Sequence, residues 1–337
     1  MTEGSGGLVV AGLAFLVSAG LILLLRPLFR RYALALPNPR SSHVEPTPQG
    51  GGLAVVIAVA IALGTAALIL EEEQSALVSM LPVGAAAVLL TAIGGIDDVC
   101  GIAVFPRLIF QALAVAIAVA SAPDELRVVP FVPLAVERGA EILAALWFVN
   151  LFNFMDGIDL MAVTETTSIA AGIILFASLG AVTPVAGLTA LALIGAMLGF
   201  APFNRPVATL FLGDVGSLPI GLALFWLLLL VAGSGHFAAA LLLPLYYLGD
   251  STVTLLWRIG HRENILSPHR SHFYQVATRR GMSVTAIISR VFAINTMLLG
   301  LAGVTLAYPS LYVGIAMLAL GGLTVTVLLA RFARGKR

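Results

Sequence analysis

Apolar residues form long runs along this chain, and short polar segments separate the runs. A helix that crosses a membrane needs about 20 mostly apolar residues, and eleven segments meet that requirement. The connections between them leave no room for a soluble domain. We therefore expect an all-α polytopic membrane protein with a single domain over residues 1–337. The predicted spans are residues 7–29, 51–70, 79–96, 106–122, 138–155, 159–179, 183–200, 208–231, 236–257, 285–307 and 310–332.

The composition supports a membrane protein, because 60% of the residues are hydrophobic and only 10% are charged. Soluble domains contain about 45–50% apolar residues. The first span does not have the charge order of a signal peptide, in which positive charge precedes the apolar stretch. Here Glu3 precedes it and Arg26, Arg30 and Arg31 follow it, which predicts an N-terminus outside. The single cysteine, Cys100, excludes an intramolecular disulfide and a cysteine metal cluster.

The basic residues predict which face of the membrane each loop occupies. An odd number of spans with the N-terminus outside places the C-terminus inside. Of the 18 Arg and Lys residues, only Arg127 and Arg138 then fall outside. Cytoplasmic loops carry the basic excess, so this orientation is favoured over its inverse. The predicted inside segments are residues 30–50, 97–106, 153–159, 200–208, 258–284 and the tail.

Nearly all the unusual polar clusters fall on this predicted inner face. Asp97 and Asp98 are adjacent carboxylates at the end of an apolar run, where a cation would relieve their repulsion. Carboxylates suit Mg²⁺, which binds through one or two of them plus substrate phosphates. One of the pair is alternatively a general base, with a pKa raised by its neighbour. A solvated helix end is the competing interpretation.

Two further acidic segments belong to the same face. In NLFNFMDGID, the spacing of three places Asn153, Asp156 and Asp159 on one face if the segment is helical. In FLGDVGS, Asp214 is either a helix N-cap or a metal ligand that glycines let other groups approach.

Two inner loops supply donors for anions. His269, Arg270 and His272 suit a diphosphate, because topology requires no histidine there. The first loop adds Asn38, Arg40 and His43, followed by a glycine run that is not a P-loop. A zinc site is excluded by the histidine spacing. Carboxylates for a metal beside donors for anions at a membrane predict phosphoryl transfer on a lipid.

Six segments in order resemble one family, the polyprenyl-phosphate N-acetylhexosamine-1-phosphate transferases, from Pro37 to about Gln275. The O-antigen-initiating branch is the more similar one, because no lysine follows the aspartate pair and the last loop has no run of adjacent histidines. The segments are PNPRSSHVEPTPQGGG, GGIDD with RLIFQ, NLFNFMDGID, FLGDVGS, PLYYLGD and SPHRSHFYQ.

The resemblance implies a Mg²⁺-dependent reaction, with Mn²⁺ as a substitute. A UDP-N-acetylhexosamine (N-acetylglucosamine, N-acetylgalactosamine or a 6-deoxy relative) gives its sugar-1-phosphate to undecaprenyl phosphate at the cytoplasmic face of the bacterial inner membrane. It implies Asp214 and Asp97 as metal ligands, and Asp97 and Asp98 as the catalytic pair. The expected substrate-binding residues are Asn38, Arg40, His43, Asn153, Asp156, Asp159, His269, Arg270 and His272.

The expected partners are the two substrates, the lipid bilayer and a second copy of the chain, and no nucleic acid. The expected role is the first step of O-antigen-type polysaccharide assembly, by direct attack of the lipid phosphate rather than through an aspartyl intermediate. The alternatives are the muramoyl-pentapeptide transferase of peptidoglycan synthesis and an ion-coupled transporter that uses Asp250 and Glu165, which lie inside spans. The CDP-alcohol class is excluded, because its signature is absent.

Overall fold

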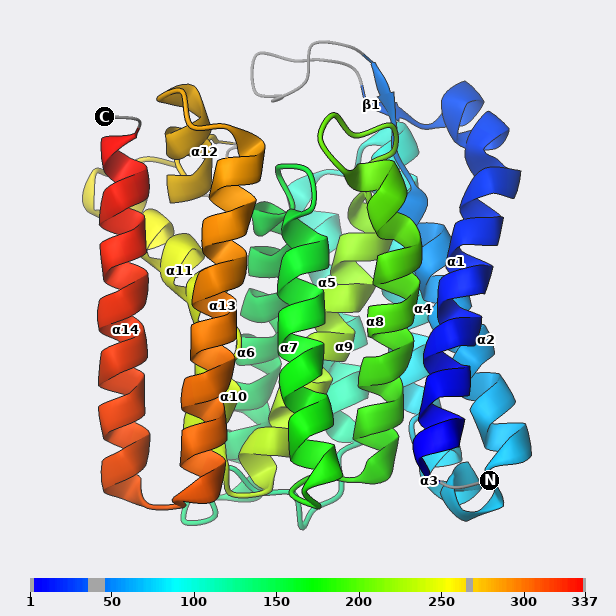
Figure 1. Ribbon diagram of the computed structural model, residues 1–337, viewed down its shortest axis with the longest axis vertical. Coiled ribbons are helices and arrows are strands. Elements are labelled where there is room, and N and C mark those ends of the chain that lie inside the picture. Colours follow the sequence, from blue (N-terminus) through cyan, green and yellow to red (C-terminus); the bar gives the residue numbers. More distant parts are fainter. Residues whose placement is uncertain (1–2, 36–45, 265–268, 336–337) are drawn as a thin grey trace.

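The protein, described by a computed structural model over residues 3–35, 46–264 and 269–335, is built from helices that run alongside one another (Figure 1). One two-stranded antiparallel sheet lies at the end of the bundle where α1 ends. The elements are α1 (Glu3–Tyr32), β1 (Leu34–Ala35), β2 (Thr47–Pro48), α2 (Gly51–Ile69), the 3₁₀ turn η1 (Glu71–Glu73), α3 (Gln74–Ser79), α4 (Leu81–Cys100), α5 (Val104–Ala120), α6 (Leu134–Met155), α7 (Met161–Ser178), α8 (Pro184–Asn204), α9 (Asp214–Gly233), α10 (Phe237–Leu242), α11 (Leu245–Gly260), α12 (Phe273–Arg279), α13 (Val284–Ala307) and α14 (Leu311–Arg334).

The predicted all-α polytopic membrane fold is confirmed. Within the described residues, eight helices are long and apolar enough to cross a membrane. The remaining predicted spans fall on α5, on α6 and on the pair α10–α11. Helix α1 begins at one end of the bundle and α14 ends at the other (Figure 1). Which end faces the cytoplasm stays a prediction.

The span predicted over residues 236–257 is wrong as a single helix. The structure breaks it into α10 and α11, with Leu243 and Pro244 between them. Proline has no amide hydrogen and its ring clashes with the preceding helical turn, so a helix is interrupted there. The buried Glu165 of α7 accepts a hydrogen bond from Asn295 Nδ2 of α13 at 2.7 Å. Glu165 thus holds helices together inside the bundle.

Helix α9 lies at the centre of the bundle and positions the polar end. In its most apolar stretch 83% of residues are buried, against 22% in α1 at the edge. Helix α9 packs against α4 and α6, which run antiparallel to it. The start of α9 therefore lies beside the ends of α4 and α6, and this brings the polar segments of three helices together.

The glycine run after the first loop packs helices rather than binding phosphate through its amides. Gly51 and Gly52 donate their amides to the carbonyls of Phe211 and Leu212, at 2.9 and 2.8 Å. A Cβ at Gly52 would collide with the backbone of Gly216. The close contact between α2 and α9 therefore requires glycine on both sides. The backbone amides of Gly51 and Gly52 already donate to carbonyls of the chain.

Candidate active site

A cavity of about 750 Å³ opens at the polar end of the bundle, where segments far apart in the sequence meet. One part of its wall is polar and the other is apolar. The polar lining residues are Gln49, Asp97, Asp98, Arg107, Asn150, Asn153, Asp214, His269, His272 and Gln275, and the apolar ones include Leu108, Leu143, Leu146, Trp147 and Leu255.

Asp97 and Asp214 share one cation in this cavity. Arg107 Nη1 lies 2.6 Å from Asp97 Oδ2 and 3.4 Å from Asp214 Oδ2. The other oxygen of Asp97 accepts the amide of Ile102 at 2.5 Å. Among the described residues of the cavity wall, two carboxylates thus face a single guanidinium. The predicted proximity of Asp97 and Asp214 is thus what the structure has.

Asp98 points to a different partner from its neighbour. Its two carboxylate oxygens accept the amides of Asp214 and Val215, both at 3.0 Å. These are the first two amides of α9, which its own helix leaves without partners. Gly213 has φ of 78°, and a Cβ there would strike the Asp98 carboxylate. Asp98 therefore caps α9 across the bundle and fixes the place of Asp214.

Asn153 lies in the last turn of α6 and completes the setting of Asp214. Its Nδ2 donates to Asp214 Oδ1 at 2.7 Å and to Ser217 Oγ at 2.8 Å. One oxygen of Asp214 thus meets an amide and the other meets Arg107.

The predicted shared helical face of Asn153, Asp156 and Asp159 is wrong. Helix α6 ends at Met155, and α7 begins at Met161, so the two aspartates lie in the connecting turn. A Cβ at Gly157 would strike the hydroxyl of Tyr274, which explains why the chain turns there on a glycine.

The two aspartates of this turn differ in position. Asp159 is buried and its Oδ2 accepts the amide of Ala208 at 3.0 Å, so it holds the connection that leads to α9. Asp156 is not part of the cavity wall. Burial, and then the charges of Asp214, Asp98 and Asp159, raise the pKa of Asp156 well above its usual range. The neighbouring acids thus lie close enough to Asp156 to disfavour its charged form, in addition to the effect of burial.

His272 lines the cavity and is positioned by a buried carboxylate, that of Asp250. Asp250 of α11 is fully buried, and its Oδ1 lies 3.3 Å from His272 Nδ1. The same carboxylate accepts the amides of Phe273 and Tyr274 at 2.9 and 3.2 Å, so it caps α12. With Nδ1 held by Asp250, Nε2 is the nitrogen left to face a ligand.

His269 lies beside His272, with ring centroids 4.9 Å apart. Burial, and then the positive charges of His272 and Arg258, lower the pKa of His269 to about 4. His269 is therefore neutral near pH 7, so its ring offers hydrogen bonds rather than charge. Arg270 belongs to the same loop but not to the cavity wall. The predicted Asn38, Arg40 and His43 lie outside the described residues.

Sequence reasoning missed Arg107 and the role of Asp250. Arg107 is the only Arg or Lys between Arg40 and Arg127, and it follows the aspartate pair by one short turn. A lone cation so close to two acids was the signal available. The partner of Asp250 had no such signal, because His272 and Asp250 are joined only by the fold.

The donors present fit a magnesium ion. No group of three His, Cys, Asp or Glu side chains in the described part of the chain is arranged around a common point for a metal. Mg²⁺ needs fewer, because it binds through one or two carboxylates and completes its shell with water and substrate phosphates. Asp97 and Asp214 supply two carboxylates that contact the same guanidinium nitrogen. They are the residues that would hold the ion.

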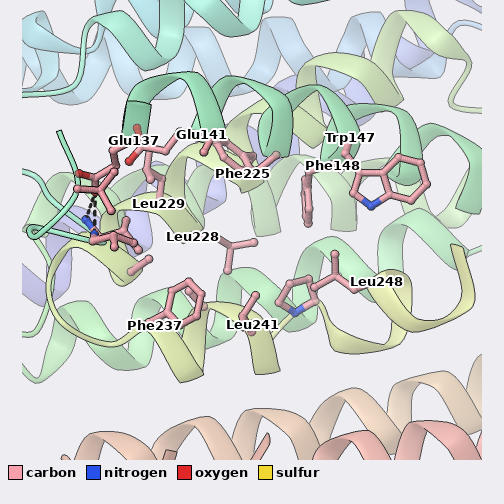
Figure 2. Close-up of a pocket in the computed structure, with 18 of the residues that line it drawn as sticks. Glu137, Glu141, Trp147, Phe148, Phe225, Leu228, Leu229, Phe237, Leu241 and Leu248 are labelled. Carbon is pink, nitrogen blue, oxygen red and sulfur yellow. Dashed lines mark hydrogen bonds between the residues drawn. The ribbon is translucent and has the colours of Figure 1, made fainter. Parts of the chain in front are cut away.

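A second cavity, of about 360 Å³, lies along α6 (Figure 2). Both cavities are lined by Trp147. The second is walled almost entirely by apolar side chains from α6, α9, α10 and α11, among them Phe148, Phe225 and Leu228, with Glu137 and Glu141 at its far end. An apolar space thus adjoins the charged one.

Comparison with known proteins identifies one domain family. Residues 80–232 match the family described as Glycosyl transferase family 4. This segment begins one residue before α4 and ends within α9, so it includes Asp97, Asp98, Arg107 and Asp214. It does not include His269 and His272.

Several named proteins are similar to this chain. It is 28% identical over 316 residues to the probable undecaprenyl-phosphate N-acetylglucosaminyl 1-phosphate transferase of Bacillus subtilis, with 87% of this chain and 86% of that protein aligned. It is 32% identical over 212 residues to the decaprenyl-phosphate N-acetylglucosaminephosphotransferase of Mycolicibacterium smegmatis, with 57% and 52% aligned. It is 33% identical over 199 residues to the phospho-N-acetylmuramoyl-pentapeptide-transferase of Leuconostoc citreum, with 53% and 60% aligned.

The first two names give a polyprenyl phosphate and N-acetylglucosamine, and the third gives phospho-N-acetylmuramoyl-pentapeptide. The chain is a multi-pass membrane protein, and its residues 80–232 are similar to glycosyl transferase family 4.

Proposed function

We propose that this protein transfers N-acetylhexosamine-1-phosphate from a UDP-sugar to undecaprenyl phosphate, which yields the lipid diphosphate sugar and UMP. The observation that carries the proposal is the composition of the two neighbouring cavities. Carboxylates, a guanidinium and two histidines line the first, and the second, of about 360 Å³ and almost entirely apolar, shares Trp147 with it. A charged headgroup with an isoprenoid tail matches that distribution.

The metal site would be formed by Asp97 and Asp214. A bound Mg²⁺ would neutralise phosphate oxygens and polarise the phosphorus that is attacked. Asp98 contributes indirectly, because its oxygens hold the first two amides of α9 and so set the position of Asp214. Asn153 orients the second oxygen of Asp214.

The anion donors would be Arg107, His269 and His272. Arg107 would provide charge-assisted hydrogen bonds to a substrate phosphate. His272, held at Nδ1 by Asp250, presents Nε2 to the diphosphate or the sugar.

The nucleophile would be an oxygen of the lipid phosphate, which attacks the β-phosphorus while the bond to the α-phosphate breaks and UMP leaves. A phosphate monoester has a second pKa near 6, so most of it is already a dianion near pH 7. A strong base is not needed for this attack. That favours positioning roles for Asp97 and Asp98 over a covalent aspartyl intermediate, which needs one of their oxygens to be unengaged.

The acceptor tail would extend from the first cavity past Trp147 into the second. The apolar side chains of Leu143 and Leu146 line the first part of this path. Phe148 and Leu228 line the second. Burying each methylene of an isoprenoid there is worth about 0.8 kcal/mol.

N-acetylglucosamine is the sugar we propose first, because two of the relatives described are named for it. The motif pattern supports a role in surface polysaccharide of the O-antigen type. The second candidate is the muramoyl-pentapeptide substrate, which one relative's name supports.

The test is an assay with purified protein, undecaprenyl phosphate, Mg²⁺ and a panel of UDP-sugars, with the lipid product identified by mass. We expect UMP release and a product mass of undecaprenyl diphosphate plus one N-acetylhexosamine. A product formed only from UDP-N-acetylmuramoyl-pentapeptide would select the second candidate. Absence of UMP release from every donor, combined with solute uptake in liposomes, would replace the transferase by a transporter.

We also propose that the site faces the cytoplasm of the inner membrane. Cys100 is exposed and lies two residues after Asp98, and it is the only cysteine of the chain. A membrane-impermeant maleimide should therefore label inside-out vesicles and spare intact spheroplasts. The reverse labelling pattern would invert the topology.

A further inference from the structure

The last part of the chain carries positive charge only. Glu263 is the final acidic residue, and eight Arg or Lys residues follow it. No side-chain carboxylate after Glu263 is therefore available to pair with these basic residues. Their counter-charges come from other segments of the protein or from a bound ligand.

Three of these arginines converge on one hollow. It has a volume of about 370 Å³ and lies where α13 begins and α14 ends, beside α12 (Figure 1). The charged lining residues are Arg290, Arg331 and Arg334. Arg280 lies at its rim, because a Cβ on Gly335 would meet the Arg280 side chain. In the part of the chain that the structure describes, no ion pair involves any of the three.

The helix ends explain two of the arginines but not the third. Arg331 and Arg334 lie in the last turn of α14, where cations complement the negative end of the helix dipole. Arg290 belongs to α13, and its Nη1 donates to the carbonyl of Ala286 at 2.6 Å. The guanidinium is thus held back toward the start of its own helix, which is the positive end. That position is unfavourable for a cation unless an anion shares it.

We propose that this hollow binds a phosphate group, as a site separate from the cavity that contains Asp97 and Asp214. Guanidinium groups pair with phosphate through parallel hydrogen bonds, and three of them can share one anion. The site lies at the ends of two membrane-spanning helices, at the level where lipid headgroups lie. Basic pockets between such helices are typical binding sites for anionic headgroups.

The phosphate has two sources, an anionic lipid headgroup or a soluble phosphate, and the experiment separates them. The full-length protein is purified in detergent, and binding of phosphatidylglycerol is measured by native mass spectrometry with phosphatidylcholine as the neutral competitor. The pocket variant is Arg290→Gln/Arg331→Gln. The matched control is Arg30→Gln/Arg31→Gln, which removes two exposed arginines from the end of α1.

We expect the pocket variant to bind phosphatidylglycerol about tenfold or more weakly than the wild type, with the control unchanged. Displacement of the lipid by inorganic phosphate at comparable concentration would assign the site to soluble phosphate. Equal binding by the pocket variant and the control would overturn the proposal.

A second variant guards against misfolding of the first. Arg334→Gln changes an exposed side chain in the final turn of α14 and leaves Arg290 in place. We expect it to keep the wild-type unfolding temperature in phosphatidylcholine and to lose phosphatidylglycerol affinity several-fold. Unchanged affinity in this correctly folded variant would also overturn the site. None of these readouts depends on transferase activity, so the result is independent of the proposed function.

Discussion

The carboxylates near the two ends of α6 differ in how many guanidinium groups they have as partners. At the end distant from the candidate site, Glu137 is bound by Arg127 at 2.5 Å and by the amides of Val128 and Val129. Glu141, one turn further on, has Arg138 at 2.8 Å. At the other end of the helix, Asp97 and Asp214 compete for Arg107.

The difference separates structural acids from ligand-binding acids. At the far end each carboxylate has its own guanidinium, so the charge is balanced within the chain and the acids hold the loop before α6. Among the residues that the structure describes, the cavity wall at the site end carries three aspartates and one arginine. This imbalance is the basis for proposing a cation there, and the far end has no such imbalance.

The strongest way to break the comparison is to remove one carboxylate from each end and measure turnover. Asp97→Asn and Asp214→Asn should each lower kcat by at least about 100-fold, since metal stabilisation of phosphoryl transfer is worth several kcal/mol. Glu141→Gln should leave kcat within about twofold. UMP release with saturating substrates is the measurement. Equal loss at both ends would show that the acids act through folding alone.

Asp98 and Glu137 sharpen the comparison, because both bind two backbone amides. Asp98→Ala and Glu137→Ala should each lower the free energy of unfolding by about 3 kcal/mol, since buried amides are left without acceptors. Only Asp98→Ala should also lower kcat, because only Asp98 positions Asp214. Thermal unfolding in detergent together with UMP release checks both parts. Full activity in Asp98→Ala would contradict the capping role.

Metal binding gives a third test that needs no substrate. The addition of Mg²⁺ should stabilise the wild type and Glu141→Gln by about 1–3 kcal/mol once the ion exceeds its dissociation constant. It should stabilise Asp97→Asn and Asp214→Asn by much less. Unfolding temperatures with Mg²⁺ and with a chelator provide the comparison. Equal stabilisation of all four proteins would move the metal away from these residues.

The smallest expected effect concerns two histidines. The pKa of His269 at the site is lowered from 6.5 to about 4 by burial and by the charges of His272 and Arg258, whereas that of His236 at the far end is lowered by burial alone. The unfolded chain therefore binds protons that the fold excludes. The stability that each histidine contributes is present above about pH 6.5 and is lost as the pH falls.

His269→Gln and His236→Gln should both flatten the decline of the unfolding temperature below about pH 6.5. Added salt should reduce the wild-type effect at His269 more than at His236, because salt screens the contribution of neighbouring charges. An acid slope that neither substitution changes would exclude both histidines as its source.

Periodicity and apolar length could predict most of this fold, because membrane helices must satisfy their own backbone and fill the apolar layer. Each predicted span coincides with a helix or with the pair α10–α11. The sequence shows a proline at position 244, but the pattern of apolar residues did not predict that the helix is interrupted there. The turn at Gly157 could not be predicted from the sequence, because Tyr274, which a side chain there would strike, is more than 100 residues away.

The site was predictable in composition but not in division of labour. Hydropathy and charge predicted that Asp97, Asp98 and Asp214 lie at one end of the bundle. Adjacent carboxylates look equivalent in a sequence, yet one side chain turns to Arg107 and its neighbour to the start of α9. That choice depends on how α4 and α9 pack, and a linear pattern does not contain it.

The contact between Asp98 and the start of α9 has a consequence for how fast the site can respond. Because this carboxylate ties the end of α4 to the first residues of α9, the separation of Asp97 and Asp214 is fixed during folding. Their mutual repulsion is overcome once, when the chain folds, and not at each encounter with an ion. If a cation binds there as proposed, Asp97 and Asp214 would already be in place for it, and little reorganisation energy would be needed.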